Sequence, residues 1–188
     1  MNTEIDLSGI ILHTERLVLR PWRPSDLEDF FAYASVDGVG QMAGWEPHAN
    51  RAESQRILDR FIAKKRTFAL EYQGKAIGSL GVEEYNEERF PEFADKRCRE
   101  IGYVLSKEYW GRGLMPEAVQ ETLRFLFETV GLDVVLCGHF LSNAQSQRVQ
   151  EKCGFTHYAF GTFKTKMNTI EPDEINVLTK EAWLAAHR

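Results

Sequence analysis

The sequence predicts a mixed α/β domain in which helices cover both faces of a sheet. Apolar residues alternate along 14–20, as they do in a strand with one buried face. They recur at helical spacing in 50–65 and again in 115–129. The run 133–140 is continuously apolar, which is typical of a strand buried on both faces. Strands and helices therefore alternate along the chain, and the helices are expected to form layers above and below the sheet.

Length and composition indicate one ordinary globular domain. The 188 residues fit a single domain, with a core expected at about 13–180. The net charge of -5 disfavours general binding to nucleic acid or to anionic membranes. No apolar run reaches the ~18–20 residues of a membrane span, and the acidic N-terminus lacks a signal-peptide pattern, so a cytoplasmic protein is expected. The three cysteines show no CxxC and the histidines no HExxH spacing, so neither disulfides nor a bound metal is expected.

The first half of the chain is expected to hold a strand, two helices and a hairpin. Pro21 ends the first strand, and Pro24 to Asp26 supply residues that favour a helix start. Turn residues at 73–75 separate two strand-like runs. The expected elements are a strand at 14–20, helices at 24–35 and 50–65, and hairpin strands at 67–72 and 76–85.

The second half is expected to continue with alternating strands and helices. The polar stretch 86–97 is interpreted as a long loop, a feature that in compact domains is usually functional or mobile. The expected elements are strands at 99–106, 133–140, 155–164 and 175–178, helices at 115–129 and 144–152, and a C-terminal tail. Trp183 and Leu184 in that tail suit either a dimer contact or core packing.

A glycine turn between the strand 99–106 and the following helix is a candidate anion site. Gly111 and Gly113 flank Arg112, and Pro116 stands in what would be the first helical turn. Free N–H groups and the helix dipole favour a negative ligand at such a terminus, and glycines let it approach the backbone. An ordinary strand–loop–helix connection fits the same residues. The sequence has no GxxxxGK[ST], no complete dinucleotide fingerprint and no GxSxG, so these sites are not predicted.

Several motifs in order resemble the GNAT superfamily of acyl-CoA N-acyltransferases. They are EIGYVL at 100–105, YWGRGLM at 109–115, SN at 142–143 and KCGF at 152–155. TERLVLRPW at 14–22 with PSD at 24–26 is similar to the branch that contains ribosomal-protein N-alpha-acetyltransferases. The resemblance covers about residues 13–180 and implies the GNAT fold, with a largely antiparallel central sheet.

The resemblance also implies an acetyl-CoA site. The strand before the glycine turn would hold the acetyl-pantetheine arm through Val104, Leu105 and Ser106. The pyrophosphate would lie on the amides of Gly111, Arg112, Gly113, Leu114 and Met115. Asn143 matches a position whose amide contacts CoA, although it could instead cap the short helix. The sequence departs from the family's Q/R-x-x-G-x-G/A pattern, with Trp110 at the first position and Met115 at the last.

Two residues are candidates for the chemistry. Gln150 replaces the tyrosine that many members use as the acid, whereas Ser146 matches a serine of the ribosomal-protein branch. Ser146 is expected either to donate to the thioester sulfur or to be a plain surface residue. Glu100 is the candidate base, acting through water, unless it is paired with Arg97 or Arg99.

The expected function is acetyl transfer from acetyl-CoA to a primary amine by direct attack in a ternary complex. The acceptor would be a small amine or a protein N-terminus, and the protein a monomer or homodimer. Acidic residues at 83, 84, 87 and 88 suit a cationic amine or form a solvated face. The alternative is a module that binds acyl-CoA without catalysis, which Gln150 favours.

Overall fold

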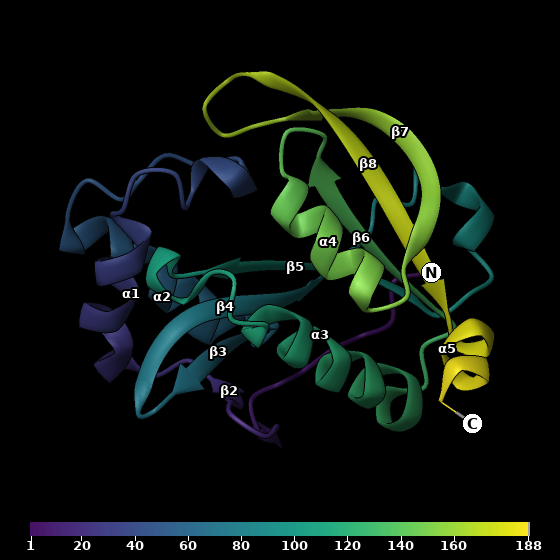
Figure 1. Ribbon diagram of the computed structural model, residues 1–188, viewed down its shortest axis with the longest axis horizontal. Helices are drawn as coiled ribbons and strands as arrows, with labels where there is room; N and C mark the ends of the chain where they lie inside the picture. Colours follow the sequence, from purple (N-terminus) through teal and green to yellow (C-terminus); the bar gives the residue numbers. More distant parts are fainter. Residues whose placement is uncertain (188) are drawn as a thin grey trace.

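The computed structural model describes residues 1–187 and contains one eight-stranded sheet (Figure 1). The strands lie in the order β1-β2-β3-β4-β5-β6-β8-β7. Their bounds are β1 (Leu12–His13), β2 (Val18–Pro21), β3 (Thr67–Tyr72), β4 (Lys75–Glu83), β5 (Cys98–Leu105), β6 (Val134–Phe140), β7 (Thr156–Lys164) and β8 (Ile170–Thr179). The α-helices are α1 (Leu27–Ala34), α2 (Arg51–Lys64), α3 (Leu114–Arg124), α4 (Ala144–Lys152) and α5 (Lys180–Ala186). The short turns are η1 (Pro24–Asp26), η2 (Gln41–Ala43), η3 (Pro91–Phe93) and η4 (Lys107–Tyr109), and the π-helical η5 (Phe125–Val130) extends α3.

The sheet opens between β5 and β6, its one parallel pair. These strands are paired from Cys98 with Val134 to Ile101 with Cys137. Beyond that point β6 stays paired with β8, whereas 102–105 of β5 are paired only with β4. One backbone edge of 102–105 therefore faces a gap in the sheet, and unpaired peptide groups there are free to bind a ligand.

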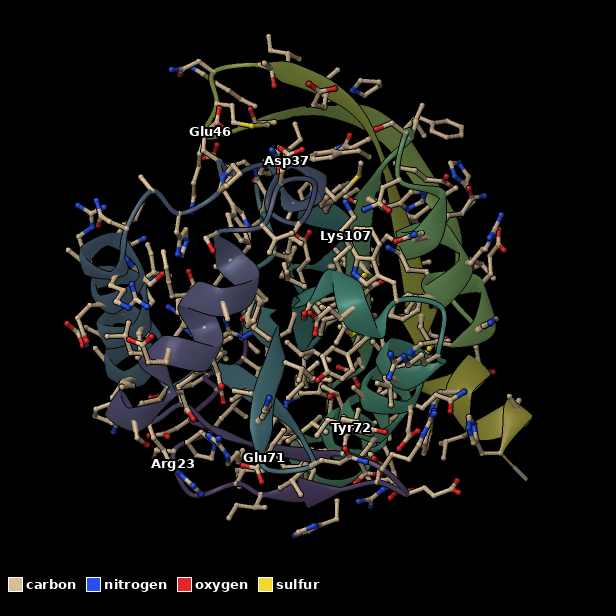
Figure 2. All side chains as sticks on the ribbon, turned by 60° about the vertical axis from the view of Figure 1, so that its left-hand side comes forward. Arg23, Asp37, Glu46, Glu71, Tyr72 and Lys107 are labelled. Carbon is tan, nitrogen blue, oxygen red and sulfur yellow. The ribbon has the colours of Figure 1, made fainter. Side chains whose placement is uncertain are left out.

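Helices cover both faces of the sheet. One core lies between the sheet and α3, where Leu123 and Phe127 are buried. A second core lies under α1 and α2 and includes Phe30 and Leu58. The Lys107 ammonium donates to the Asp37 carbonyl at 3.4 Å and so links η4 to the segment after α1 (Figure 2). The predicted mixed α/β class, the largely antiparallel sheet and the two helical layers are confirmed.

Three elements differ most from the sequence prediction. The strand predicted at 14–20 is β2, which covers only Val18–Pro21, because Thr14 and Arg16 turn toward Glu117 of α3. The last strand is Ile170–Thr179 and not 175–178, because it forms a long hairpin with β7. The predicted C-terminal tail is the helix α5, whose Trp183 is buried against Phe127.

The stretch 86–97 is anchored to the rest of the fold. It contains η3, and Phe90 is buried in a core with Tyr85 and Ile175. Arg89 reaches across to Asp173 of β8.

In residues 1–187 no helix combines the length and the apolarity that a membrane crossing requires.

Candidate active site

The gap between β5 and β6 opens into a pocket of about 790 Å³. The start of α3 and one side of α4 line one end of this pocket. The other end is lined by η2, the segment 86–90 and the facing ends of β6 and β8. We call these two parts the cradle end and the far end. The pocket thus crosses the sheet at the opening between β5 and β6.

The cradle end is built on the predicted glycine turn. Gly111 and Gly113 both have φ +74°, in the left-handed region that favours glycine, and α3 begins directly after them at Leu114. Gly111, Gly113, Leu114 and Met115 all line the pocket. Arg112 does not, because its guanidinium lies over the Tyr109 ring at 5.1 Å.

Arg16 fixes the position of this turn. Its guanidinium donates to the Arg112 carbonyl at 2.9 Å and pairs with Glu117 of α3 at 2.7 Å. Thr14 also donates to the Glu117 carboxylate. The segment before β2 therefore holds both the turn and the first part of α3, which keeps the free helix amides in one orientation.

The free edge of β5 lies next to the turn. Val104 and Leu105 line the pocket, whereas Ser106 does not, because its amide donates to the Ile77 carbonyl at 2.7 Å on the β4 side. The Trp110 indole N–H donates to the Leu105 carbonyl at 2.8 Å. The unusual Trp110 thus satisfies one backbone group at the end of the open edge.

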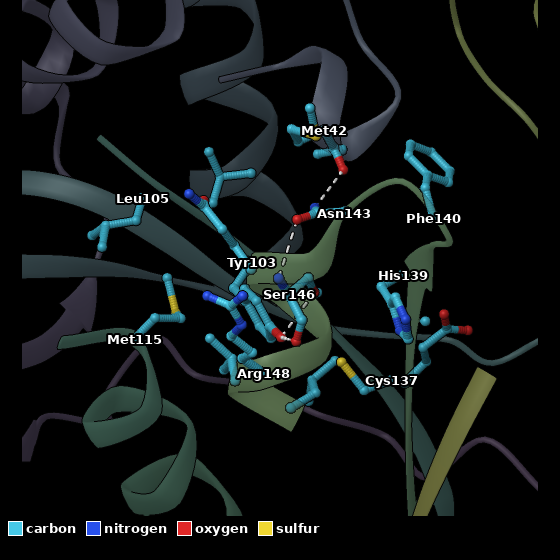
Figure 3. Close-up of a pocket in the computed structure, with 18 of the residues that line it drawn as sticks. Met42, Tyr103, Leu105, Met115, Cys137, His139, Phe140, Asn143, Ser146 and Arg148 are labelled. Atoms are coloured by element: carbon cyan, nitrogen blue, oxygen red, sulfur yellow. Dashed lines mark hydrogen bonds between the residues drawn. The ribbon is translucent and has the colours of Figure 1, made fainter. Parts of the chain in front are cut away.

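Asn143 caps α4, which is one of its two predicted roles. Its side-chain oxygen accepts from the Ser146 amide at 3.1 Å, and its amide nitrogen donates to the Met42 carbonyl at 3.3 Å. Asn143 therefore ties α4 to η2 and lines the pocket at the same time (Figure 3).

Ser146 belongs to a network of polar side chains at the middle of the pocket. Its hydroxyl lies 3.0 Å from the Tyr103 hydroxyl and accepts from the Gln150 amide at 3.2 Å. Gln150 also donates to the Gly138 carbonyl at 3.2 Å, and its oxygen accepts from Asn176 at 2.8 Å. Both N–H groups of Gln150 are therefore engaged, and its amide is held in one orientation.

Tyr103 is a functional candidate that the sequence did not single out. The alternation of β5 places its side chain under α4, and burial raises the pKa of the phenol, which therefore stays protonated. When Tyr103 donates to Ser146, the serine oxygen accepts twice and its own hydrogen is left for a ligand. Only the three-dimensional approach of β5 to α4 reveals this pair.

Glu100 lies on the other face of β5 from Tyr103, since the two are three residues apart on a strand. Within residues 1–187 its carboxylate forms no hydrogen bond or ion pair, because Arg99 binds the Thr3 carbonyl and Arg97 the Val130 carbonyl. Burial raises the pKa of Glu100 to about 7, and the nearby Arg89 only partly offsets this effect. A carboxylate with this pKa suits a general base at neutral pH.

The charges differ between the two ends of the pocket. Arg148 and Lys152 of α4 line the cradle end and form no ion pair within residues 1–187. Figure 3 shows Arg148 and Met115 on one side of Ser146, and His139 and Phe140 on the other. Glu83, Glu100 and Asp173 line the far end. Arg148 is not predicted from the sequence, because a lone arginine on an exposed helix belongs to no motif.

Cys137 lines the pocket, but burial raises the pKa of its thiol and so disfavours the thiolate. No group of three His, Cys, Asp or Glu residues in the described part of the chain could hold a metal ion. The pocket therefore offers amides and cations at one end, a paired hydroxyl network in the middle, and an unpaired carboxylate beyond it.

Comparisons with known proteins identify relatives of this chain. A family model described as the acetyltransferase (GNAT) domain matches residues 16–156. The uncharacterized N-acetyltransferase YoaA of Bacillus subtilis is 31% identical over 152 residues, which cover 77% of this chain and 82% of that protein.

Two solved structures share the fold. A GNAT-family acetyltransferase from Bacillus anthracis has a TM-score of 0.80 at 20% identity, over 92% of this chain and 99% of that one. The ribosomal-protein-S5-alanine acetyltransferase of Vibrio fischeri has a TM-score of 0.71 at 20% identity, over 93% of this chain and 99% of that one. The family match and the Bacillus subtilis relative establish that this chain belongs to the GNAT acetyltransferase family and is an N-acetyltransferase.

Proposed function

We propose that the protein transfers the acetyl group of acetyl-CoA to a primary amine by direct attack within a ternary complex. The family transfers acetyl groups from acetyl-CoA, and the helix amides and unpaired cations at one end of the pocket support this co-substrate. The observation that carries the proposal is the placement of Glu100 and the Tyr103–Ser146 pair on opposite faces of β5, at the gap through which both substrates would meet.

The cradle end would hold the CoA phosphates. The amides at 111–115 offer N–H groups at the start of α3, where the helix dipole adds positive potential. Arg148 and Lys152 supply unpaired positive charge beside them. The pantetheine arm would then run along the open edge of β5 at Val104 and Leu105, with the Asn143 side chain across from it.

The chemistry would follow from this placement. The amine nitrogen bonds to the thioester carbonyl carbon, the C–S bond breaks and its electron pair goes to sulfur. The arriving ammonium first releases one proton to solvent to become the neutral nucleophile, and Glu100 takes the proton that this amine loses on forming the amide, through a water molecule. Ser146 donates a hydrogen bond to the sulfur as negative charge develops there, and the released thiolate takes its proton from solvent.

Tyr103 and Gln150 would act on Ser146 as positioning residues. Gln150 donates to the serine oxygen, and when Tyr103 donates to it as well, the serine hydrogen turns toward the pocket. Gln150, which stands at the family's tyrosine position, would thus orient the donor instead of marking a lost activity. This arrangement favours an enzyme over the alternative of a module that only binds acyl-CoA.

A protein N-terminus remains one candidate acceptor. The solved structure from Vibrio fischeri is named as a ribosomal-protein-S5-alanine acetyltransferase, and a protein N-terminus of that kind is a primary amine. Small amines without a peptide are the other class.

The test is release of CoA thiol from acetyl-CoA with a panel of amines and peptides, together with acetyl-CoA binding by calorimetry. We expect binding, turnover with at least one acceptor, and a loss of roughly 10²-fold in kcat for Ser146→Ala. Ser142→Ala, an exposed serine just before α4, is the matched control and should keep the wild-type rate. Binding without turnover by any acceptor would support the binding module, and no CoA binding would refute both functions.

A further inference from the structure

We propose that the acceptor is a primary amine attached to an apolar group, with no carboxylate on the carbon that carries the amine. This inference rests on the proposed function, because it assigns the far end of the pocket to the acceptor. It predicts that amines and carboxyl-blocked amino acids are substrates and that free amino acids are not.

The carboxylates of the far end favour a cation. Of the four acidic residues at 83, 84, 87 and 88, only Glu83 lines the pocket, since Glu84 pairs with Arg66 and Glu87 with Asn2. Glu83 is the cross-strand partner of Glu100, which also lines the pocket. An arriving ammonium is attracted to this pair, whereas a carboxylate on the adjacent carbon is repelled.

The arginine of the far end is already engaged. Both terminal nitrogens of Arg89 donate to Asp173, each at 3.0 Å. Asp173 is 4% exposed, so Arg89 could turn to a substrate carboxylate only by leaving a buried carboxylate unpaired. His139 faces Glu174 at 3.5 Å through Nε2, whereas its buried Nδ1 has no hydrogen-bond partner within residues 1–187. Among the described residues a substrate carboxylate therefore finds no free lysine or arginine here, in contrast to the cradle end with Arg148 and Lys152.

The remaining walls of the far end are apolar and aromatic. Phe90 and Phe140 are buried with one side on the pocket, and the Phe163 ring lies 5.9 Å from that of Phe140. Ile175 and Met42 complete this surface. Aromatic faces bind both apolar groups and ammonium ions, so they suit an apolar amine.

A panel of matched acceptors tests the proposal in the wild-type enzyme. We expect kcat/KM for phenethylamine and for phenylalanine amide to exceed that for phenylalanine roughly tenfold or more. Phenethylamine is a stronger base than phenylalanine, so a smaller fraction of it is the neutral, nucleophilic amine at a given pH. A faster reaction of phenethylamine therefore cannot be explained by its protonation state. Phenylalanine amide should also exceed glycine amide. Equal rates with phenylalanine and phenethylamine would overturn the inference, whereas no turnover with any amine would instead contradict the proposed function.

Two variants test the charge argument. Asp173→Asn frees Arg89, and Glu83→Gln removes a repelling charge at the rim, where the side chain is exposed and folding is not at risk. Each should raise the ratio of the phenylalanine rate to the phenethylamine rate severalfold. Acetyl-CoA binding checks that each variant is folded, and should Asp173→Asn fail that check, Glu83→Gln decides alone. An unchanged ratio in the folded variants would overturn the proposal.

Discussion

At the scale of single residues, the Tyr103–Ser146 contact is expected to help stabilise the leaving thiolate. Tyr103→Phe removes one hydrogen bond from the serine oxygen and keeps the ring. We expect kcat to fall roughly fivefold to tenfold, the equivalent of a hydrogen bond of about 1 kcal/mol, with KM for acetyl-CoA unchanged. Steady-state kinetics measure both constants, and Tyr72→Phe, on β3 outside this pocket, is the control. A KM effect alone would mean that Tyr103 only shapes the binding site.

Glu100 gives the rate a defined pH dependence. Its carboxyl pKa is raised to about 7, so the base is protonated and inactive below that pH. The ratio of the wild-type rate to the Glu100→Gln rate should rise as pH increases through 7 and then level off. Taking the ratio removes the titration of the amine substrate, which is common to both enzymes. The range from pH 5.5 to 8.5 covers roughly 1.5 units on each side of the Glu100 pKa. A ratio that does not change over this range would exclude Glu100 as the base.

The same residue affects stability. The pKa of Glu100 is higher in the folded protein than its ordinary value of 4.5, so the folded state binds this proton more tightly than the unfolded state. The free energy of unfolding therefore falls as pH rises from 4.5 to about 7 on account of this group. Glu100→Gln should raise the melting temperature more at pH 8 than at pH 4.5. Thermal unfolding at the two pH values measures this difference, and an equal change at both would contradict it.

At the scale of elements, the segment before β2 orients the start of α3. Arg16→Ala removes the contacts to the Arg112 carbonyl and to Glu117. We expect KM for acetyl-CoA to rise roughly threefold to tenfold, as for an anion contact worth about 1 kcal/mol, with kcat nearly unchanged. Arg124→Ala is the matched control, because Arg124 pairs with Glu121 and Glu128 on the exposed side of α3. Equal effects of both substitutions would show a loss of stability instead of a loss of orientation.

The elements also show what sequence patterns can predict. Gly111 and Gly113 were predicted as a cradle because the requirement for a positive φ and a following helix is local. Ser146 was predicted because it matches a serine of the ribosomal-protein branch. Glu100 was predicted from its place at the start of the motif EIGYVL at 100–105. Tyr103 was not, because its contact with Ser146 joins β5 to a helix 43 residues later. Helix α5 was missed because its seven residues carry only one buried anchor, Trp183.

At the scale of the whole molecule, the opening of the sheet organises the site. The gap between β5 and β6 lets one pocket cross the sheet, with unpaired cations at one end and carboxylates at the other. Acetyl-CoA carries negative phosphates and an amine acceptor arrives as a cation, so under the proposed function each substrate would have a complementary end. The net charge of -5 does not predict this separation of positive and negative side chains, because it sums over the whole chain.

The most direct test of the central claim is a crystal structure of the protein with acetyl-CoA bound. We expect the pyrophosphate on the amides of 111–115, the pantetheine along Val104 and Leu105, and the thioester sulfur within hydrogen-bond distance of the Ser146 hydroxyl. The acetyl group should then point through the gap toward Glu100. Phosphates bound away from the start of α3, or a sulfur remote from Ser146, would contradict the account.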